Sequence, residues 1–137
     1  MIRLATMNDI DAIKQVAKDY THELGFILRP ALEAAVQREE LLYDPPTGAF
    51  CHFHRRRDMV SVIYEICVPD EARGQGIARQ MINMLLVPIQ LKCPVDNESN
   101  KFYEHIGFKL VEVQQGKKRK LNLWRLDNRF AGSDTPG

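Results

Sequence analysis

The chain passes from an apolar strand into a helix through the stretch Val68-Pro69-Asp70-Glu71-Ala72-Arg73-Gly74-Gln75-Gly76-Ile77-Ala78. The first amides of a helix are unpaired and point outward, so such a junction is a ready site for an anion. Gly74 and Gly76 let a phosphate approach the backbone without meeting a Cβ atom, and Arg73 adds a positive charge. These residues therefore predict a seat for a phosphate or pyrophosphate group.

Two other kinds of phosphate-binding loop do not fit this stretch. It lacks the G-x-x-x-x-G-K-[ST] pattern of nucleoside triphosphatases. The dinucleotide fingerprint G-x-G-x-x-G needs a glycine-type residue at the position of Arg79, and the expected strand order does not suit a Rossmann half. The remaining alternative is a tight strand-to-helix turn that binds no ligand.

The residues around this stretch predict an uneven alternation of strands and helices. The expected order is a strand over 2–5, helices over 10–20 and 30–39, strands over 41–43, 49–54 and 60–68, a helix from 77 that Pro88 ends, a strand over 89–93, a helix over 99–105, and a hairpin over 108–114 and 121–126. A capping box from Thr6 to Asp9 should start the first helix, and Gly107 should stop the last one.

The central strand, helix and strand should form a right-handed crossover with parallel pairing. The predicted fold class is therefore α/β, with a mixed, partly antiparallel sheet of about seven strands flanked by four helices. Residues 1–127 are expected to form a single domain, and residues 128–137 have the composition of a flexible tail.

Composition fits one ordinary cytoplasmic domain. The chain has 137 residues, of which 45% are hydrophobic and 27% charged, and its net charge of +1 recruits neither nucleic acid nor an anionic membrane. Apolar runs such as Met84–Ile89 are too short to span a bilayer, and the N-terminus lacks a signal-peptide core. Cys51, Cys67 and Cys93 are widely spaced, which favours buried thiols over a disulfide framework, a zinc site or a nucleophile.

Two segments together resemble the GNAT N-acetyltransferase superfamily. The family signature Q/R-x-x-G-x-G/A resembles Arg73-Gly74-Gln75-Gly76-Ile77-Ala78, preceded here by Val68-Pro69. A second family segment, an N-x-x-A-x-x-F-Y-like run closing on G-F, resembles Asn97-Glu98-Ser99-Asn100-Lys101-Phe102-Tyr103-Glu104-His105-Ile106-Gly107-Phe108. The expected order of elements from Ile2 to about Leu126 also resembles that fold.

The resemblance implies acetyl-CoA as co-substrate and no metal. It implies that the pyrophosphate rests on the backbone amides of Arg73, Gly74, Gln75, Gly76, Ile77 and Ala78. It further implies that the pantetheine arm pairs with the backbone of Ile66, Cys67 and Val68, in a gap where the parallel strands separate after Tyr64 and near Lys92. Asn97 and Asn100 are further candidate cofactor contacts, although an ungapped count back from Tyr103 puts Asp96 at the family's asparagine and Ser99 at its alanine.

Acetyl transfer from a thioester to an amine needs two proton movements, since the amine must lose a proton and the departing thiolate is helped by a donor. Tyr103 is the candidate donor, a phenol that is protonated at neutral pH; the alternative is an aromatic anchor for its helix. Glu65 and Tyr64 are the candidate bases. Strand alternation points Glu65 away from the face of Val62 and Tyr64 unless the strand bulges.

The predicted function is direct transfer of an acetyl group to a primary amine of a small molecule or peptide in a ternary complex; the alternative is a catalytically weak CoA-binding sensor or interaction module. His52 and His54 share one strand face, which without a third ligand favours a polar sheet face over a metal site. The basic hairpin tips Arg55–Arg57 and Lys117–Lys120 leave an acidic substrate or a weakly held nucleic acid open. The neutral net charge counts against nucleic acid, no membrane partner is expected, and an exposed strand edge makes a homodimer reasonable.

Overall fold

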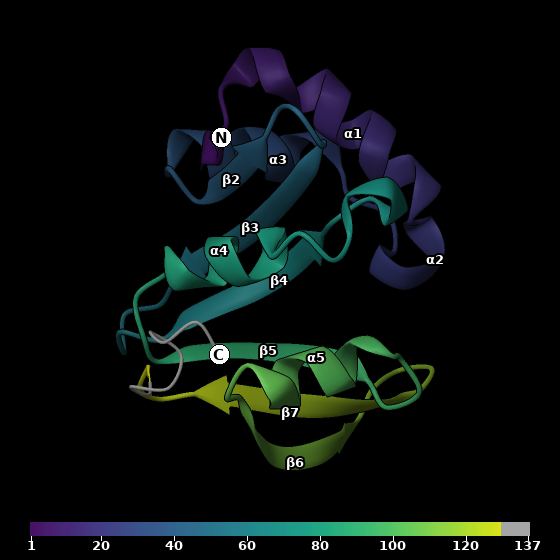
Figure 1. The fold of residues 1–137 in the computed structure, drawn as a ribbon, viewed down its shortest axis with the longest axis vertical. Helices are drawn as coiled ribbons and strands as arrows, with labels where there is room; N and C mark the ends of the chain where they lie inside the picture. The colour runs from purple at the N-terminus through teal and green to yellow at the C-terminus, as the bar shows by residue number, and fades with distance from the viewer. Residues whose placement is uncertain (130–137) are drawn as a thin grey trace. The chain divides into compact units, whose positions relative to one another are not determined.

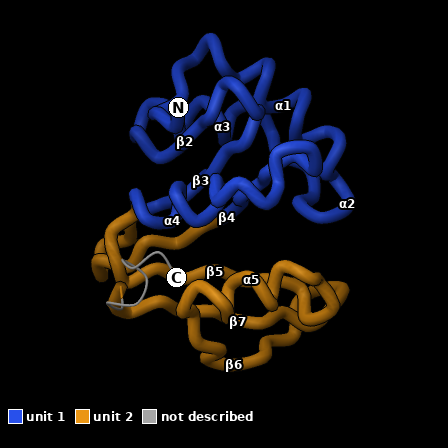
Figure 2. The backbone as a smooth tube through the Cα atoms, viewed as in Figure 1, with its two compact units in different colours: residues 1–54, 64–84 blue, residues 55–63, 85–137 orange. Residues whose placement is uncertain are grey.

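A computed structural model describes residues 1–129 of the chain, and these form two compact units (Figures 1 and 2). Unit 1 comprises Met1–His54 and Tyr64–Met84, whereas unit 2 comprises Arg55–Ile63 and, of the described residues, 85–129. Of the predicted tail, only Asn128 and Arg129 lie within the described residues. The prediction of a single domain over residues 1–127 stays a prediction.

The fold class predicted from the sequence is confirmed. Hydrogen bonding orders the strands β1-β2-β3-β4-β5-β7-β6 in one mixed sheet of seven strands, and β4 contributes residues to both units. Unit 1 contains β1 (Arg3–Leu4), the 3-10 turn Met7–Asp9, α1 (Ile10–Asp19), α2 (Thr21–Leu24), α3 (Arg29–Gln37), β2 (Leu41–Asp44), β3 (Ala49–Arg55) as far as His54, the second half of β4 (Ser61–Cys67), the 3-10 turn Asp70–Ala72 and α4 (Ile77–Asn83). Unit 2 contains the first half of β4, β5 (Ile89–Pro94), α5 (Ser99–His105), β6 (Lys109–Gln115) and β7 (Lys120–Leu126).

The core of unit 1 forms between helices α1 and α3 and the strands beneath them (Figure 1). Ile10 and Ile13 of α1 and Leu32 of α3 are fully buried against Phe50 of β3, as helical spacing predicts for the inner faces of both helices. Val16, Tyr20 and Val36 continue these faces at the edge of the core. The core therefore fixes α1 and α3 on the strands of this unit.

The predicted capping box opens the first helical segment. The backbone N–H of Thr6 donates to Oδ2 of Asp9 at 2.7 Å, which satisfies a donor at the start of the 3-10 turn that leads into α1. The guanidinium of Arg3 donates to the same carboxylate at 2.7 and 3.1 Å. The hydrogen bond from Arg3 lowers the pKa of Asp9 to about 2.

In unit 2, β5 is the central strand between β4 and β7. It pairs in parallel with β4 from Ser61–Ile89 to Ile63–Leu91, as the crossover prediction requires, and antiparallel with β7. The hairpin of β6 and β7 shifts its register between Leu110 and Glu112. The order of the sheet leaves β6 as an edge strand, as the sequence analysis expects for one side of the sheet.

Two helix predictions need correction. The helix after Gly76 was expected to run to Pro88, but α4 ends at Asn83. The carbonyl oxygen of Leu86 instead accepts hydrogen bonds from the guanidinium of Arg55 at 2.9 Å and the hydroxyl of Ser61 at 2.7 Å. These hydrogen bonds hold the backbone after α4 to residues of unit 2. The one-turn helix α2 was not expected and adds a fifth helix to the four predicted ones. No helix within residues 1–129 is long and apolar enough to cross a bilayer.

Candidate functional site

The glycine loop of unit 1 has the backbone shape that the sequence analysis expects of an anion seat. Gly74 and Gly76 have φ angles of +84° and +78°, in the left-handed region that favours glycine. A Cβ atom built on either glycine would meet no protein atom within 4 Å, so the space over both residues is open. Gly76 caps α4, and the amides of Ile77 and Ala78 in its first turn have no partner within the helix. The loop therefore offers glycine backbone and helix amides to open space.

Arg73 is not simply a free positive charge beside this loop. Its Nε donates to the carbonyl oxygen of Val68 at 3.0 Å, and its terminal nitrogens lie 3.2 Å from Asp70 and 4.0 Å from Glu23. Its guanidinium also stands 5.9 Å from the centre of the Tyr20 ring. Arg73 thus ties the start of the loop to the ends of α1 and α2, and two carboxylates offset part of its charge.

The glycine loop matches the family signature at each of its fixed positions. In Q/R-x-x-G-x-G/A, Arg73 occupies the Q/R position, Gly76 the glycine position and Ala78 the G/A position, while Gly74 occupies a position that the pattern leaves open. The positive charge at the start of the loop is therefore the one that the signature provides.

The candidate bases Glu65 and Tyr64 both contact His52, which lies on β3. Oε1 of Glu65 is 2.7 Å from Nδ1 of His52, and the Tyr64 ring centre is 5.1 Å from that of the imidazole. Along β4, Ile63 and Cys67 are buried and Tyr64 is exposed, which is the alternation expected of a regular strand. The orientation expected for Glu65 stays a prediction, and His52 lies close enough to contact both side chains.

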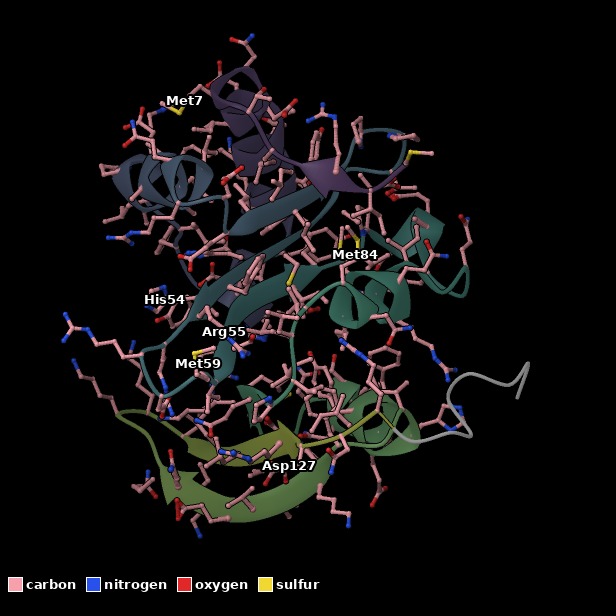
Figure 3. The ribbon with its side chains drawn as sticks, turned by 90° about the vertical axis from the view of Figure 1, so that its left-hand side faces the viewer. Met7, His54, Arg55, Met59, Met84 and Asp127 are labelled. Carbon is pink, nitrogen blue, oxygen red and sulfur yellow. The ribbon has the colours of Figure 1, made fainter. Side chains whose placement is uncertain are left out.

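The two predicted histidines form two separate pairs with carboxylates. His54, labelled in Figure 3, places Nδ1 2.9 Å from both carboxylate oxygens of Glu40. His52 pairs with Glu65 as described above. The prediction of a polar face on β3 holds. No local signal in the sequence indicated the partners, because Glu65 lies 13 residues from His52 and Glu40 lies 14 residues from His54. Within residues 1–129, no group of three or more His, Cys, Asp or Glu side chains is placed to hold a metal ion.

The remaining residues expected along the pantetheine arm end β4 in unit 1. Ile66 is half-buried and Cys67 is buried in the core, so their backbone rather than their side chains is what they offer a ligand. The carbonyl oxygen of Val68 accepts the hydrogen bond from Arg73. Pairing of a pantetheine arm with this segment stays a prediction.

Tyr103, the candidate acid, lies on α5 in unit 2. Its ring is buried, with its centre 5.5 Å from that of Phe102 and 5.7 Å from that of Phe108 in edge-to-face arrangements. Such pairs stabilise packing beyond the area that they bury. Tyr103 therefore has the anchoring role that the sequence analysis weighed, and its role as an acid stays a prediction.

The two asparagines of the second family segment are engaged within unit 2. Oδ1 of Asn97 accepts the N–H of Ser99 at 2.8 Å and so caps the start of α5. Nδ2 of Asn100 donates to the carbonyl oxygens of Pro94 and Asn97, while its Oδ1 accepts from Asn122 and from the indole N–H of Trp124 at 2.7 Å. Both amides have a structural role, which the sequence did not reveal, and their contact with a cofactor stays a prediction.

The three cysteines are free and buried, as predicted. Burial raises the pKa of Cys67 to about 12 and that of Cys93 to about 11, and it raises the pKa of Cys51 as well. The thiolate form is therefore disfavoured at neutral pH, and a nucleophilic role is not supported.

Comparisons with known proteins give matches to one family model and to several solved structures. A family model described as an acetyltransferase (GNAT) domain matches residues 32–110, which is more than half of the chain. No curated protein matches the chain in sequence. Similar solved structures include Ard1 from Thermoplasma volcanium, with a TM-score of 0.78, 14% identity, and coverage of 92% of this chain and 95% of that one.

A GNAT-family acetyltransferase from Bacillus cereus has a TM-score of 0.75 and 14% identity over 93% of this chain and 96% of its own. Naa50 from Arabidopsis thaliana, in complex with the bisubstrate analogue CoA-Ac-MVNAL, has a TM-score of 0.72 and 16% identity over 93% and 98%. At 14–16% identity the solved structures show only the fold of this chain, whereas the family model shows its family. The chain belongs to the GNAT acetyltransferase family.

Proposed function

We propose that this protein transfers the acetyl group of acetyl-CoA directly to a primary amine of a small molecule or peptide. The observation that carries the proposal is the glycine loop, in which Gly74 and Gly76 hold left-handed backbone under open space in a chain of the GNAT family. A seat of backbone amides next to a helix N-terminus suits a pyrophosphate, because the amides supply fixed donors without a bulky side chain.

Support for an amine acceptor comes from the neighbours in structure. The Naa50 structure holds an analogue that joins CoA to a peptide, and the NatC complex is bound to a Gag peptide and CoA. Each of these structures covers 93% of this chain, so the likeness in fold extends well beyond the glycine loop. A peptide amine is therefore among the first acceptors to test.

The proposed chemistry uses residues of this chain for the two proton movements. Glu65 removes a proton from the attacking ammonium, whose nitrogen then has the lone pair that adds to the thioester carbonyl. When the carbon–sulfur bond breaks, Tyr103 supplies a proton to the departing thiolate, and its phenolate then takes the second proton that the nitrogen loses as the amide forms. Acetyl-CoA supplies the activated acetyl group, and the backbone amides of Arg73–Ala78 hold its pyrophosphate.

The proposal is tested by measuring binding and turnover on the same preparation. Calorimetry with acetyl-CoA measures binding, and a thiol reagent such as dithiobis-nitrobenzoate detects CoA released in the presence of amines, polyamines, amino acids or peptides. The protein's own thiols should add little background, because all three are buried. Mass spectrometry of the acceptor, which should gain one acetyl group, is the control for simple hydrolysis of the thioester.

The outcomes separate the two functions under consideration. Release of CoA together with an acetylated amine supports the transferase. Binding of acetyl-CoA without release on any acceptor supports a CoA-binding sensor or interaction module instead. Absence of binding at millimolar acetyl-CoA contradicts both.

A further inference from the structure

The contact between His52 and Glu65 differs from the other histidine–carboxylate pair on the same strand. His52 and Glu65 have side chains that are only 15% and 19% exposed, and within residues 1–129 Glu65 is bonded through one oxygen, Oε1. His54 is 39% exposed and its Nδ1 meets both oxygens of Glu40. His52 is therefore more enclosed than His54, although Glu40, at 12% exposed, is as enclosed as Glu65, and the first pair leaves the second oxygen of its carboxylate available.

From this geometry we infer that His52 is a positioning residue: it fixes the Glu65 carboxylate so that Oε2 takes the proton of the acceptor amine. The inference rests on the proposed function and adds a residue to it. An ionised carboxylate only accepts hydrogen bonds, so Nδ1 of His52 must carry the proton of the 2.7 Å bond. That bond holds a flexible glutamate side chain in one orientation, which lowers the entropic cost of reaching the reactive geometry.

The proton step balances without any further reactant. The N–H bond of the substrate ammonium breaks, its electron pair stays on nitrogen, and the proton forms a new bond to Oε2 of Glu65. Nδ1 of His52 keeps its own proton and its hydrogen bond to Oε1 throughout. The carboxylic acid then returns its proton to water, and Glu65 is ready for the next turnover.

The test uses two substitutions of His52 and a matched control. The amide nitrogen of asparagine can occupy the place of Nδ1, so His52→Asn keeps the donor and loses the ring, while His52→Phe keeps a ring and loses the donor. We expect kcat to fall roughly 10- to 100-fold in His52→Phe, with the KM for acetyl-CoA unchanged. His52→Asn should recover kcat to within about threefold, because the donor to Oε1 is kept. The control His54→Phe should stay within about threefold of the parent protein.

A double substitution tests whether His52 acts through Glu65. In a Glu65→Gln background, His52→Phe should cause little further loss, because the residue that it positions is already disabled. Circular dichroism and thermal melting check that each variant folds. If His52→Phe does not fold, the His52→Asn and Glu65→Gln proteins still test the positioning role.

The possible results distinguish this inference from the proposed function. Equal losses in His52→Asn and His52→Phe, a comparable loss in His54→Phe, or additive losses with Glu65→Gln overturn the positioning role while acetyl transfer stands. A parent protein that binds acetyl-CoA but acetylates no amine overturns the transferase, and the role of His52 with it.

Discussion

Substitution of Gly76 by asparagine should separate the folding of the glycine loop from its capacity to bind a phosphate. Gly76 has φ +78° and ψ +15°, and asparagine is among the residues that enter this left-handed region most readily. The space that its Cβ would enter holds no protein atom within 4 Å. We therefore expect the free energy of unfolding to fall by only about 1 kcal/mol, which is a decrease of about 4 °C in Tm for a chain of this length.

Ligand binding should respond much more strongly than folding. Acetyl-CoA at a hundred times its Kd stabilises a folded protein by about 2.7 kcal/mol, a rise of roughly 10 °C on the same scale. In Gly76→Asn this rise should disappear, because the new side chain fills the space over the amides. Thermal melting with and without acetyl-CoA measures both effects in one series.

Gly25→Asn provides the matched control. Gly25 has φ +75° and open space around its Cβ position, but it ends α2, outside the glycine loop. Its ψ of −171° lies in a region that is more costly for other residues, so this variant should lose at least as much stability as Gly76→Asn. It should nevertheless keep the full rise with acetyl-CoA. A full ligand-induced rise in a folded Gly76→Asn protein would refute the reasoning and place the pyrophosphate elsewhere.

Three further predictions follow from the contacts described above. Tyr103→Phe keeps the buried ring, so turnover should fall roughly 10²- to 10⁴-fold at nearly unchanged acetyl-CoA affinity, with a smaller loss for a thioester of a more acidic thiol; weakened binding at intact turnover would make Tyr103 an anchor only. Asn100→Ala removes the acceptor of the buried Trp124 indole, and denaturant unfolding should show a loss of about 1–3 kcal/mol. Asp9, whose pKa of about 2 lies below its unfolded value, contributes stability that is complete above about pH 4 and is lost as the pH falls through 2. Asp9→Asn should therefore be less stable by about 1 kcal/mol at pH 7 and match the parent protein near pH 2, and an equal deficit at both pH values would contradict this account.

Local patterns in the sequence were sufficient to predict most elements. The spacing of Ile10 and Ile13 predicted the buried face of α1, and the run Ser99–His105 followed by Gly107 predicted the bounds of α5. These signals lie within one or two turns of the residues that they describe, so a single sequence contains them. The glycine loop was predictable for the same reason, because its φ angles depend on Gly74 and Gly76 themselves.

The features that the sequence did not predict depend on partners far along the chain. The end of α4 at Asn83 could not be read from Pro88, because the following segment is held by Arg55, which lies 31 residues before Leu86. The contact of Glu65 with His52 on the neighbouring strand joins residues 13 positions apart, and no local pattern in the sequence indicates it.

The hydrogen bond between Trp124 and Asn100 gives the protein a built-in spectroscopic reporter. Trp124 is the single tryptophan of the chain, it is only 5% exposed, and it lies in unit 2. Its fluorescence should be blue-shifted in the native state and should shift to the red when unit 2 unfolds. The far-ultraviolet circular dichroism of helices comes mainly from unit 1, which holds α1 to α4. Coincident denaturation curves from the two signals would identify one cooperative folding unit, and separated midpoints would identify two.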